Sequence, residues 1–282
     1  MELKLRSPDR PFLPMRQIMG AHDAVSARIA AEAGFDAIWA SSLGISARLG
    51  RCDRDEVPWC ELTDVAEQIS ESVALPVILD GVDGGGSSNV VRQMARRSWR
   101  HGLAGLSLED KAWPRSNSLA GQVKLLEPIE FAAKFSACRE VVDKGDFLLI
   151  ARTDAFIAGE QSEQVIERAL CYAEAGADAV IVHSRASDVR QIAEFMAAWP
   201  GDCPIIVIPT TFPDVTLPEL DSLGISGVVW ANQLLRASML AMRSVASLIR
   251  ADDLDGKSPG GDQSLSAVLE LGNCGWCERN SP

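Results

Sequence analysis

Short runs of apolar, often β-branched residues alternate with longer amphipathic stretches along most of this chain. The apolar runs lie at residues 17–19, 37–40, 77–80, 105–108, 147–151, 179–182, 205–208 and 227–230. Between and after them, helical patterns cover residues 24–33, 62–73, 89–101, 129–142, 162–175, 189–199, 217–223 and 234–250. Asp23 and Gly34 flank the first of these as an N-cap and a stop. The pattern predicts eight consecutive strand–helix units.

Strands that are apolar along their whole length are buried on both faces, which is typical of a parallel sheet covered by helices. Eight such units in about 250 residues predict an α/β fold of the (β/α)8 TIM-type barrel class. A doubly wound open sheet is the alternative, but the glycine-rich phosphate fingerprint expected after its first strand is missing. We therefore expect a catalytic barrel domain over residues 1–250. Residues 251–282 then form a linker and a tail, with an apolar helix at 264–271 that packs on a neighbouring subunit.

Composition narrows the possible partners. The chain has 282 residues, 47% of them hydrophobic, and a formal net charge of −12. An acidic protein lacks the basic patches that nucleic acids and anionic membranes require, and no apolar run approaches the ~20 residues of a membrane span. The N-terminus shows no secretory signal, and seven cysteines without a framework spacing suit a reducing compartment. The composition indicates a cytoplasmic enzyme without nucleic-acid or membrane partners.

Polar residues follow the predicted strands at their carboxyl ends, and in a barrel these ends meet at one mouth. They are Ser41, Ser42, Asp80, Asp83, Glu109, Arg152, His183 and Asn232. Asp53 can reach the same mouth from the long loop that follows the second strand. Several carboxylates at one place repel one another unless they bind a hard cation, which is Mg²⁺ or, alternatively, Mn²⁺. Arg152 and His183 favour binding of a phosphoryl or carboxylate group. The sequence thus predicts a site for a metal-chelated oxyacid.

Several motifs together resemble the phosphoenolpyruvate mutase family of the isocitrate lyase superfamily. They are GFDAIWASSLGISARLG at residues 34–50, Glu109-Asp110-Lys111 followed by Pro114 and Asn117-Ser118, IARTDAFIAG at residues 150–159, and VHSRA at residues 182–186. The likeness extends from about His22 to Arg250. It implies conversion of phosphoenolpyruvate to phosphonopyruvate, a carbon–phosphorus bond-forming step of phosphonate biosynthesis, in a homodimer or homotetramer.

The resemblance also implies roles for individual residues. Asp80 matches the direct magnesium ligand, and Asp53 and Glu109 match carboxylates that hold the ion through water. Trp39, Ser41, Ser42 and Leu43 stand on the pyruvyl side of the substrate. The expected catalytic and phosphoryl-side residues are Asp53, Lys111, Arg115, Asn117, Ser118, Arg152 and His183, with Asn117 and Ser118 on a mobile gating loop. Arg115 replaces the usual Lys, which keeps the charge and changes the geometry.

The magnesium loop departs from the family pattern. The family typically has Asp-Ala-Asp-Thr-Gly-Tyr-Gly-Asn, where this chain has Asp80-Gly81-Val82-Asp83 followed by three glycines and Ser87. Val82 cannot bind a cation or order its waters, so the metal shell loses one member. Our hypothesis is that Asp83, one position later, takes its place. Ser42, where the family often has Gly, adds a side chain near the pyruvyl pocket.

Three alternatives remain open. A phosphonopyruvate hydrolase shares the scaffold but typically has Thr at the position of Asn117. A related lyase would cleave a C–P or C–C bond of another 2-oxo or phosphonate acid; the carbon–carbon lyases of the methylisocitrate type carry a catalytic Cys in the loop after Glu109, and no Cys stands there. A catalytically impaired paralogue is supported by Val82. Separately, Cys274 and Cys277 have the spacing of a redox pair or of half a zinc site, but the strand and helix that frame a redox motif are not predicted around them.

Overall fold

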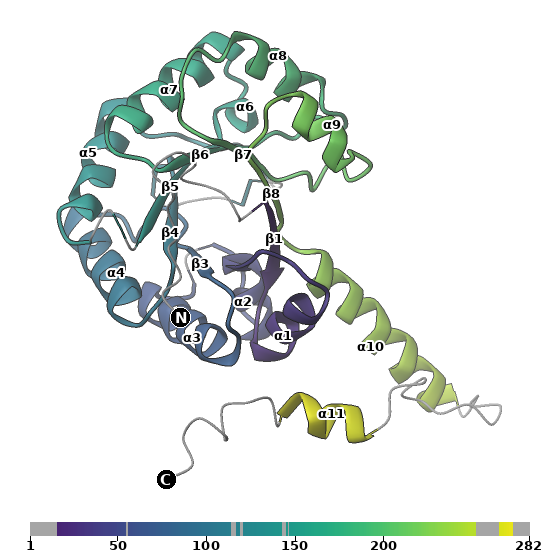
Figure 1. The fold of residues 1–282 in the computed structure, drawn as a ribbon. Helices are drawn as coiled ribbons and strands as arrows, with labels where there is room; N and C mark the ends of the chain where they lie inside the picture. The colour runs from purple at the N-terminus through teal and green to yellow at the C-terminus, as the bar shows by residue number, and fades with distance from the viewer. Residues whose placement is uncertain are drawn as a thin grey trace.

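Eight parallel strands close into a barrel in the computed structural model, which describes residues 16–54, 56–113, 117–118, 121–142, 145, 147–251 and 265–272. The strands are β1 (Gln17–Ala21), β2 (Ala37–Ala40), β3 (Val77–Asp80), β4 (Gly105–Glu109), β5 (Leu148–Thr153), β6 (Ala179–Val182), β7 (Ile205–Val207) and β8 (Gly227–Trp230). Each strand pairs with the next, and β1 pairs with β8 (Figure 1). The predicted (β/α)8 barrel is confirmed.

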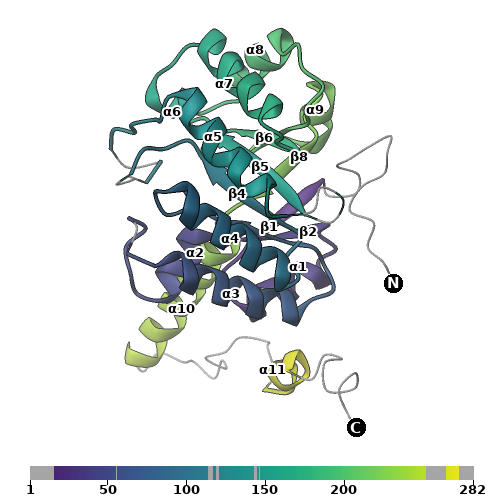
Figure 2. The same cartoon turned by 90° about the vertical axis from the view of Figure 1, so that its left-hand side faces the viewer.

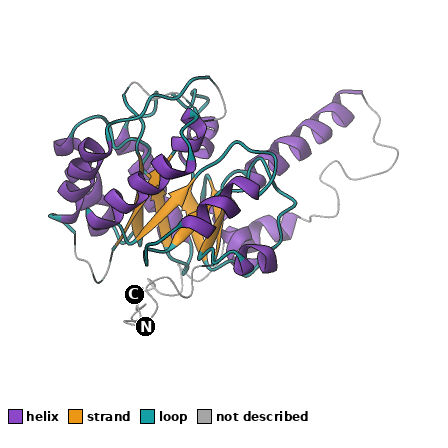
Figure 3. Ribbon diagram, turned by 90° about the horizontal axis from the view of Figure 1, so that it is seen from above, coloured by secondary structure: helices purple, strands orange, loops and turns teal. Residues whose placement is uncertain are grey.

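Helices surround the strands on the outside (Figure 3). They are α1 (Ala24–Glu32), α2 (Ser42–Arg48), α3 (Trp59–Ser72), α4 (Ser88–Arg100), α5 (Pro128–Arg139), α6 (Ala155–Ala158), α7 (Ser162–Glu174), α8 (Arg190–Ala198), α9 (Leu217–Ser222), α10 (Gln233–Ala251) and α11 (Leu265–Gly272). The first helix begins at Asp23, whose carboxylate accepts a hydrogen bond from the Ser26 amide at 2.8 Å. This is the N-cap that the sequence predicts.

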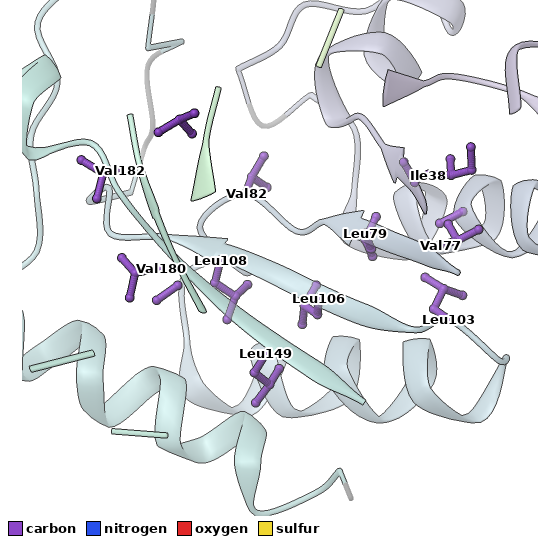
Figure 4. Close-up of a cluster of buried hydrophobic side chains, with 14 of the residues drawn as sticks. Ile38, Val77, Leu79, Val82, Leu103, Leu106, Leu108, Leu149, Val180 and Val182 are labelled. Atoms are coloured by element: carbon purple, nitrogen blue, oxygen red, sulfur yellow. The ribbon is translucent and has the colours of Figure 1, made fainter. Parts of the chain in front are cut away.

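Side chains alternate between two apolar layers because successive residues of a strand point to opposite faces. Trp39, Ile78, Ile150 and Ile181 belong to the cluster inside the barrel. Their neighbours in sequence, among them Ile38, Leu79, Leu149 and Val180, belong to the larger cluster between strands and helices. Figure 4 shows part of that outer layer, with Leu106, Leu108 and Leu149 between the strands and the helices. Both faces of the sheet are therefore buried, as the apolar strands require.

The seam between the first and last strands is tight. Met19 pairs with Trp230, and a Cβ atom on Gly20 would lie 2.1 Å from the carbonyl oxygen of Ala231. No side chain fits at that distance, so the barrel closes only with glycine at this position.

Two short helices were not predicted. The residues after Ser41 were expected to form a loop, but they form α2, where the Ser41 hydroxyl accepts a hydrogen bond from the Gly44 amide at 3.3 Å. Helix α6 follows Asp154 and ends at Gly159, which has φ 93°. Both helices come directly after strands and are only 7 and 4 residues long, too short to show a helical period in sequence.

The last two helices lie away from the ring. Helix α10 projects beyond the barrel in both views, and none of its residues is buried (Figures 1 and 2). Helix α11 corresponds to the predicted apolar tail helix, and its Leu271 carbonyl accepts a hydrogen bond from Arg28 of α1. Its packing on a neighbouring subunit stays a prediction. Within the described ranges, no helix is long and apolar enough to cross a membrane.

Candidate active site

A cavity of about 60 Å³ lies at the carboxyl ends of the barrel strands. Its lining comprises Trp39, Ser41, Ser42, Leu43, Asp53, Asp80, Val82, Glu109, Lys111, Asn117, Ser118, Arg152, His183, Ile208, Thr210, Ala231 and Asn232. Polar groups from β2, β3, β4, β5, β6, β7 and β8, or from the residues just after them, thus meet in one small space.

The alternation along each strand brings the charged residues inward. Arg152 comes two residues after Ile150, and His183 two residues after Ile181, so both share the inner face with these apolar side chains. Asp80 follows Ile78 in the same way. The apolar residues fill the middle of the barrel, and the polar residues occupy its mouth.

Asp80 stands at one side of the cavity beside α2. Its Oδ2 accepts hydrogen bonds from the Ser42 hydroxyl at 2.7 Å and the Ser42 amide at 3.2 Å. Burial raises the pKa of Asp80, and the nearby carboxylates of Glu109 and Asp53 add to the rise while Arg152 opposes it. A cation in the cavity would relieve this repulsion.

Asp154, directly after β5, lies beside the side chains of Arg152, Lys111 and His183. Its carboxylate lies 2.9 Å from Arg152 Nε, 3.1 Å from Lys111 Nζ and 3.1 Å from His183 Nδ1. Burial alone would raise the pKa of Asp154, but these neighbours hold it well below its usual range. The carboxylate is therefore ionised and fixes the positions of all three.

His183 is neutral in this setting. Burial lowers its pKa, and the adjacent Arg152 guanidinium lowers it further. The His183 Nδ1 lies 2.8 Å from Arg152 Nη2 and 3.1 Å from Asp154 Oδ1. A guanidinium only donates and an ionised carboxylate only accepts, so Nδ1 bonds to one of the two according to the tautomer. When Nδ1 accepts from Arg152, the ring proton is on Nε2 and His183 has one donor for a ligand; when Nδ1 donates to Asp154, Nε2 is an acceptor.

Two acceptors at the cavity lack a hydrogen-bond partner among the described residues. They are Glu109 Oε1 and Asn232 Oδ1. The other oxygen of Glu109 lies 3.1 Å from Lys111 Nζ. A buried carboxylate oxygen without a donor is costly, so the site is complete only when a ligand, a cation or its waters supply the missing contact.

Ser118 and Asn117 connect the loop after β4 to the site. The Ser118 hydroxyl donates to Asp154 Oδ2 at 2.5 Å and accepts from Lys111 at 2.6 Å and from Arg152 at 2.8 Å. Asn117 Nδ2 donates to Asp53 Oδ2 at 2.6 Å, which joins this loop to the one after α2.

The structure brings nearly all the predicted site residues together. Those that line the cavity are Trp39, Ser41, Ser42, Leu43, Asp53, Asp80, Glu109, Lys111, Asn117, Ser118, Arg152 and His183. Arg115, Cys274 and Cys277 lie outside the described residues.

Asp83 does not face the cavity, and the hypothesis that it replaces the missing aspartate is not supported. Its carboxylate accepts hydrogen bonds from the Gly85 and Gly86 amides at 3.1 and 3.0 Å and lies 3.8 Å from Lys134 Nζ. Val82 lines the cavity instead, with a φ of 48° that is rare for a β-branched residue. The turn that orients Val82 inward directs Asp83 away.

Sequence reasoning missed Asp154, Ile208, Ala231 and the role of Thr210. Asp154 had a usable signal, because it follows Arg152 at the same two-residue spacing that brings Arg152 inward. Thr210 and Ala231 also follow strands, but a small or uncharged residue at a strand end is too common to be informative.

The family model described as phosphoenolpyruvate phosphomutase matches residues 4–250. A phosphoenolpyruvate phosphomutase of Streptomyces hygroscopicus is 43% identical over 238 residues, covering 84% of this chain and 76% of the relative.

Two solved structures have closely similar folds. The phosphoenolpyruvate phosphomutase from Streptomyces platensis subsp. rosaceus superposes with a TM-score of 0.87 at 35% identity, covering 92% of this chain and 90% of that one. A phosphonopyruvate hydrolase in complex with oxalate and Mg²⁺ superposes with a TM-score of 0.85 at 29% identity, with the same coverage.

Proposed function

The chain belongs to the phosphoenolpyruvate phosphomutase family, whose members are phosphotransferring isomerases, and we propose that it interconverts phosphoenolpyruvate and phosphonopyruvate. In this reaction the phosphoryl group moves between the enol oxygen and the methylene carbon of one pyruvyl unit. The bond to oxygen breaks as the bond to carbon forms, and no atom is gained or lost.

The gathering of carboxylates and cationic side chains around one cavity carries the proposal. Asp80, Glu109 and Asp53 line it together with Arg152, Lys111 and His183, and Glu109 Oε2 lies 3.1 Å from Lys111 Nζ. A substrate with a phosphoryl group at one end and a carboxylate and enol oxygen at the other needs both kinds of group: cationic donors for its oxygens, and carboxylates for the metal that chelates them. Loose phosphoryl transfer depends on positioning and charge neutralisation more than on covalent chemistry.

A magnesium ion fits the acidic part through water more readily than through direct ligands. In the described part of the chain, no three His, Cys, Asp or Glu side chains form a group that could hold an ion by themselves. Asp80 as a direct ligand, with Glu109 and Asp53 acting through water, agrees with that spacing and with the unpartnered Glu109 Oε1. When bound, Mg²⁺ supplies positive charge to the enolate and carboxylate oxygens.

The protein's own groups then divide the work. Arg152 and the Nε2–H of His183 bind the phosphoryl oxygens, and Asp154 keeps both in place. The Ser41 hydroxyl and the Leu43 amide, at the start of α2, hold the carboxylate, while Ser42 donates to Asp80. Asn117, bound to Asp53, covers the mouth and excludes water, which would otherwise hydrolyse the migrating group.

Phosphonopyruvate hydrolysis is the second candidate function, because a hydrolase is among the similar solved structures. Asn117 favours the mutase, since the hydrolase pattern has Thr at this position. The impaired-paralogue alternative depends on Val82, which leaves the metal shell one carboxylate short. A carbon–carbon lyase remains the least supported, because no Cys follows Glu109 in the loop.

Phosphorus NMR of the purified protein with phosphonopyruvate and Mg²⁺ tests the proposal, with a metal-free sample as the control. We expect a phosphoenolpyruvate signal that requires the metal. Inorganic phosphate as the main product would instead establish the hydrolase, and the Asn117→Thr variant would then be compared. An unchanged phosphonopyruvate signal would rule out both activities.

We further propose that the working enzyme is a homodimer or homotetramer in the cytoplasm. Helix α10 exposes Leu240, Met242, Leu248 and Ile249, and beside it lies an apolar hollow of about 780 Å³ that Val25 and Ile29 also line. Apolar surface of this extent is typical of a subunit contact. Light scattering of the wild type and of Leu240→Glu tests the assembly. We expect an oligomer for the wild type and a smaller species for the variant, and a monomeric wild type would contradict the proposal.

The cysteines agree with the proposed cytoplasmic location. The described cysteines are all free thiols, as a reducing compartment requires: Cys52, Cys60, Cys138, Cys171 and Cys203.

A further inference from the structure

A second buried polar network lies directly behind the cavity, on the opposite face of β4 and β5. Asp110 and Thr153 each follow an inward-facing residue, so their side chains point outward to α7. There they meet Tyr172 and Arg168. Asp110, Thr153 and Tyr172 are fully buried, and Arg168 is 7% exposed. None of the four lines the cavity.

Asp110 is the acceptor at the centre of this network. Its Oδ2 accepts from the Tyr172 hydroxyl and the Thr153 hydroxyl, both at 2.8 Å, and its Oδ1 accepts from the Asp154 amide at 3.0 Å. Burial raises the pKa of Asp110 to about 6 in spite of these donors. Through the Asp154 amide, Asp110 fixes the backbone of the residue that holds Lys111, Arg152 and His183.

The same network holds the base of the loop that carries Asn117 and Ser118. The Asp110 carbonyl accepts from the Leu126 amide at 2.9 Å, and Arg168 Nη1 donates to the Leu126 carbonyl at 2.8 Å. Lys111 pairs with Leu125, and the Ala112 amide donates to the Lys124 carbonyl at 2.9 Å. Both ends of segment 111–126 are therefore bound at one point.

Arg168 completes the arrangement from α7. Its guanidinium makes two hydrogen bonds of 2.8 Å to Glu160 and one of 3.2 Å to the Tyr172 hydroxyl. Its Nη1 lies 3.7 Å from Asp110 Oδ2. Burial opposes the charge, yet these acceptors raise the pKa of Arg168, so it stays protonated. A lysine ammonium group could not replace the planar guanidinium here, because it cannot donate to all these fixed acceptors at once.

We propose that Asp110, Tyr172 and Arg168 are positioning residues that couple the base of segment 111–126 to Asp154. They touch no substrate. They hold the segment's Lys111 and Ser118 in register with Arg152, so that the cationic cluster around Asp154 stays aligned. This inference rests on the proposed function for its kinetic test, and its second test does not depend on that function.

The first test compares kinetics of Tyr172→Phe and Arg168→Lys with those of Arg139→Lys. Arg139 is a matched control because it is also a largely buried arginine on a helix beside β5. It binds the Asp178 carboxylate and the Gly176 carbonyl, but at the other end of the barrel. We expect kcat to fall about 10- to 100-fold in the first two variants, as for other partners that orient functional side chains. KM changes little, because the binding groups remain. Arg139→Lys lowers the melting temperature with kcat unchanged.

The second test measures trypsin cleavage after Lys124, which is exposed at the end of the segment. If the network holds the loop base, Tyr172→Phe accelerates this cleavage about tenfold through easier local opening. Cleavage after the exposed Arg190, far from the network in sequence, is unchanged in the same sample. Arg139→Lys leaves the rate after Lys124 as in the wild type.

The outcomes separate the two proposals. The positioning role is overturned if folded Tyr172→Phe and folded Arg168→Lys both keep the kcat of the wild type. It is also overturned if Arg139→Lys loses as much kcat as they do. If the wild type itself does not convert phosphonopyruvate, the proposed function fails, and unchanged cleavage after Lys124 in Tyr172→Phe then decides against the positioning role on its own.

Discussion

The barrel contains two buried arginine–aspartate pairs near β5, and they differ in what surrounds them. Arg139 and Asp178 lie at the amino end of the strands. Backbone groups surround that pair: the Leu149 amide donates to Asp178 at 2.8 Å, and Arg139 donates to the Phe147 and Gly176 carbonyls at 3.3 and 3.0 Å. Its acceptors and donors are supplied by the fold itself.

Arg152 and Asp154, at the carboxyl end, are surrounded by other side chains that carry or share charge. Lys111, His183 and Glu109 lie within 4 Å of one or the other, and Glu109 keeps an oxygen without a partner among the described residues. The same two residue types thus stabilise the fold at one end and leave capacity for a ligand at the other. The difference lies in whether backbone groups or titratable side chains surround the pair.

Replacing each arginine by alanine gives the largest expected effect. Arg152→Ala should lower kcat by roughly 10²–10³-fold, as for loss of one donor to transition-state charge. The Arg152→Ala variant should lose little stability, because the Asp154 carboxylate still has Lys111 and His183 as neighbours at 3.1 Å. Arg139→Ala should cost about 3–5 kcal/mol of folding free energy by breaking a buried pair, with kcat retained in the folded fraction. Kinetics and chemical denaturation of both variants check this, and similar kcat values would remove the distinction between the two ends.

Val82 offers a change of intermediate size at the functional end. Val82→Asp adds a carboxylate to the cavity at a position with φ 48°, which Asp adopts more easily than Val. We expect Mg²⁺ affinity to rise about 10- to 100-fold, measured by calorimetric titration. Val82→Asn is the control, since it relieves the same backbone conformation without a charge. Equal affinities in the Asp and Asn variants would show that charge is not the missing element.

The smallest effect concerns pH. Burial lowers the pKa of His183 below 6.5 in the folded state, so as pH falls the unfolded chain takes up this proton first. Stability from His183 is therefore fully present above about pH 7.5 and is lost as pH falls through 6.5 and below. Melting temperatures of wild type and His183→Gln between pH 8 and 5 should converge toward low pH. A difference independent of pH would mean that His183 does not titrate in this way.

Much of the site was predictable from strand periodicity. Asp80, Glu109, Arg152 and His183 come at strand ends with inward spacing, and the barrel mouth collects them. Asp83 was not predictable, because the geometry of one turn decides whether residue 82 or residue 83 faces inward. The network behind the site was hidden for another reason: Tyr172 and Arg168 are ordinary members of an amphipathic helix until their partner Asp110 is seen across from them.

The tight seam at Gly20 has a consequence for how the chain is made. Gln17 pairs with Val228, and at about 5–20 residues per second the ribosome takes roughly 10–40 s to synthesise the segment between them. During that time β1 has a partner in β2 but an unpaired edge on its other side, open to other nascent chains. The last strand must then fit against a glycine with no room to spare. Side-chain size at residue 20 therefore sets not only the stability of the finished barrel but the yield with which newly made chains close.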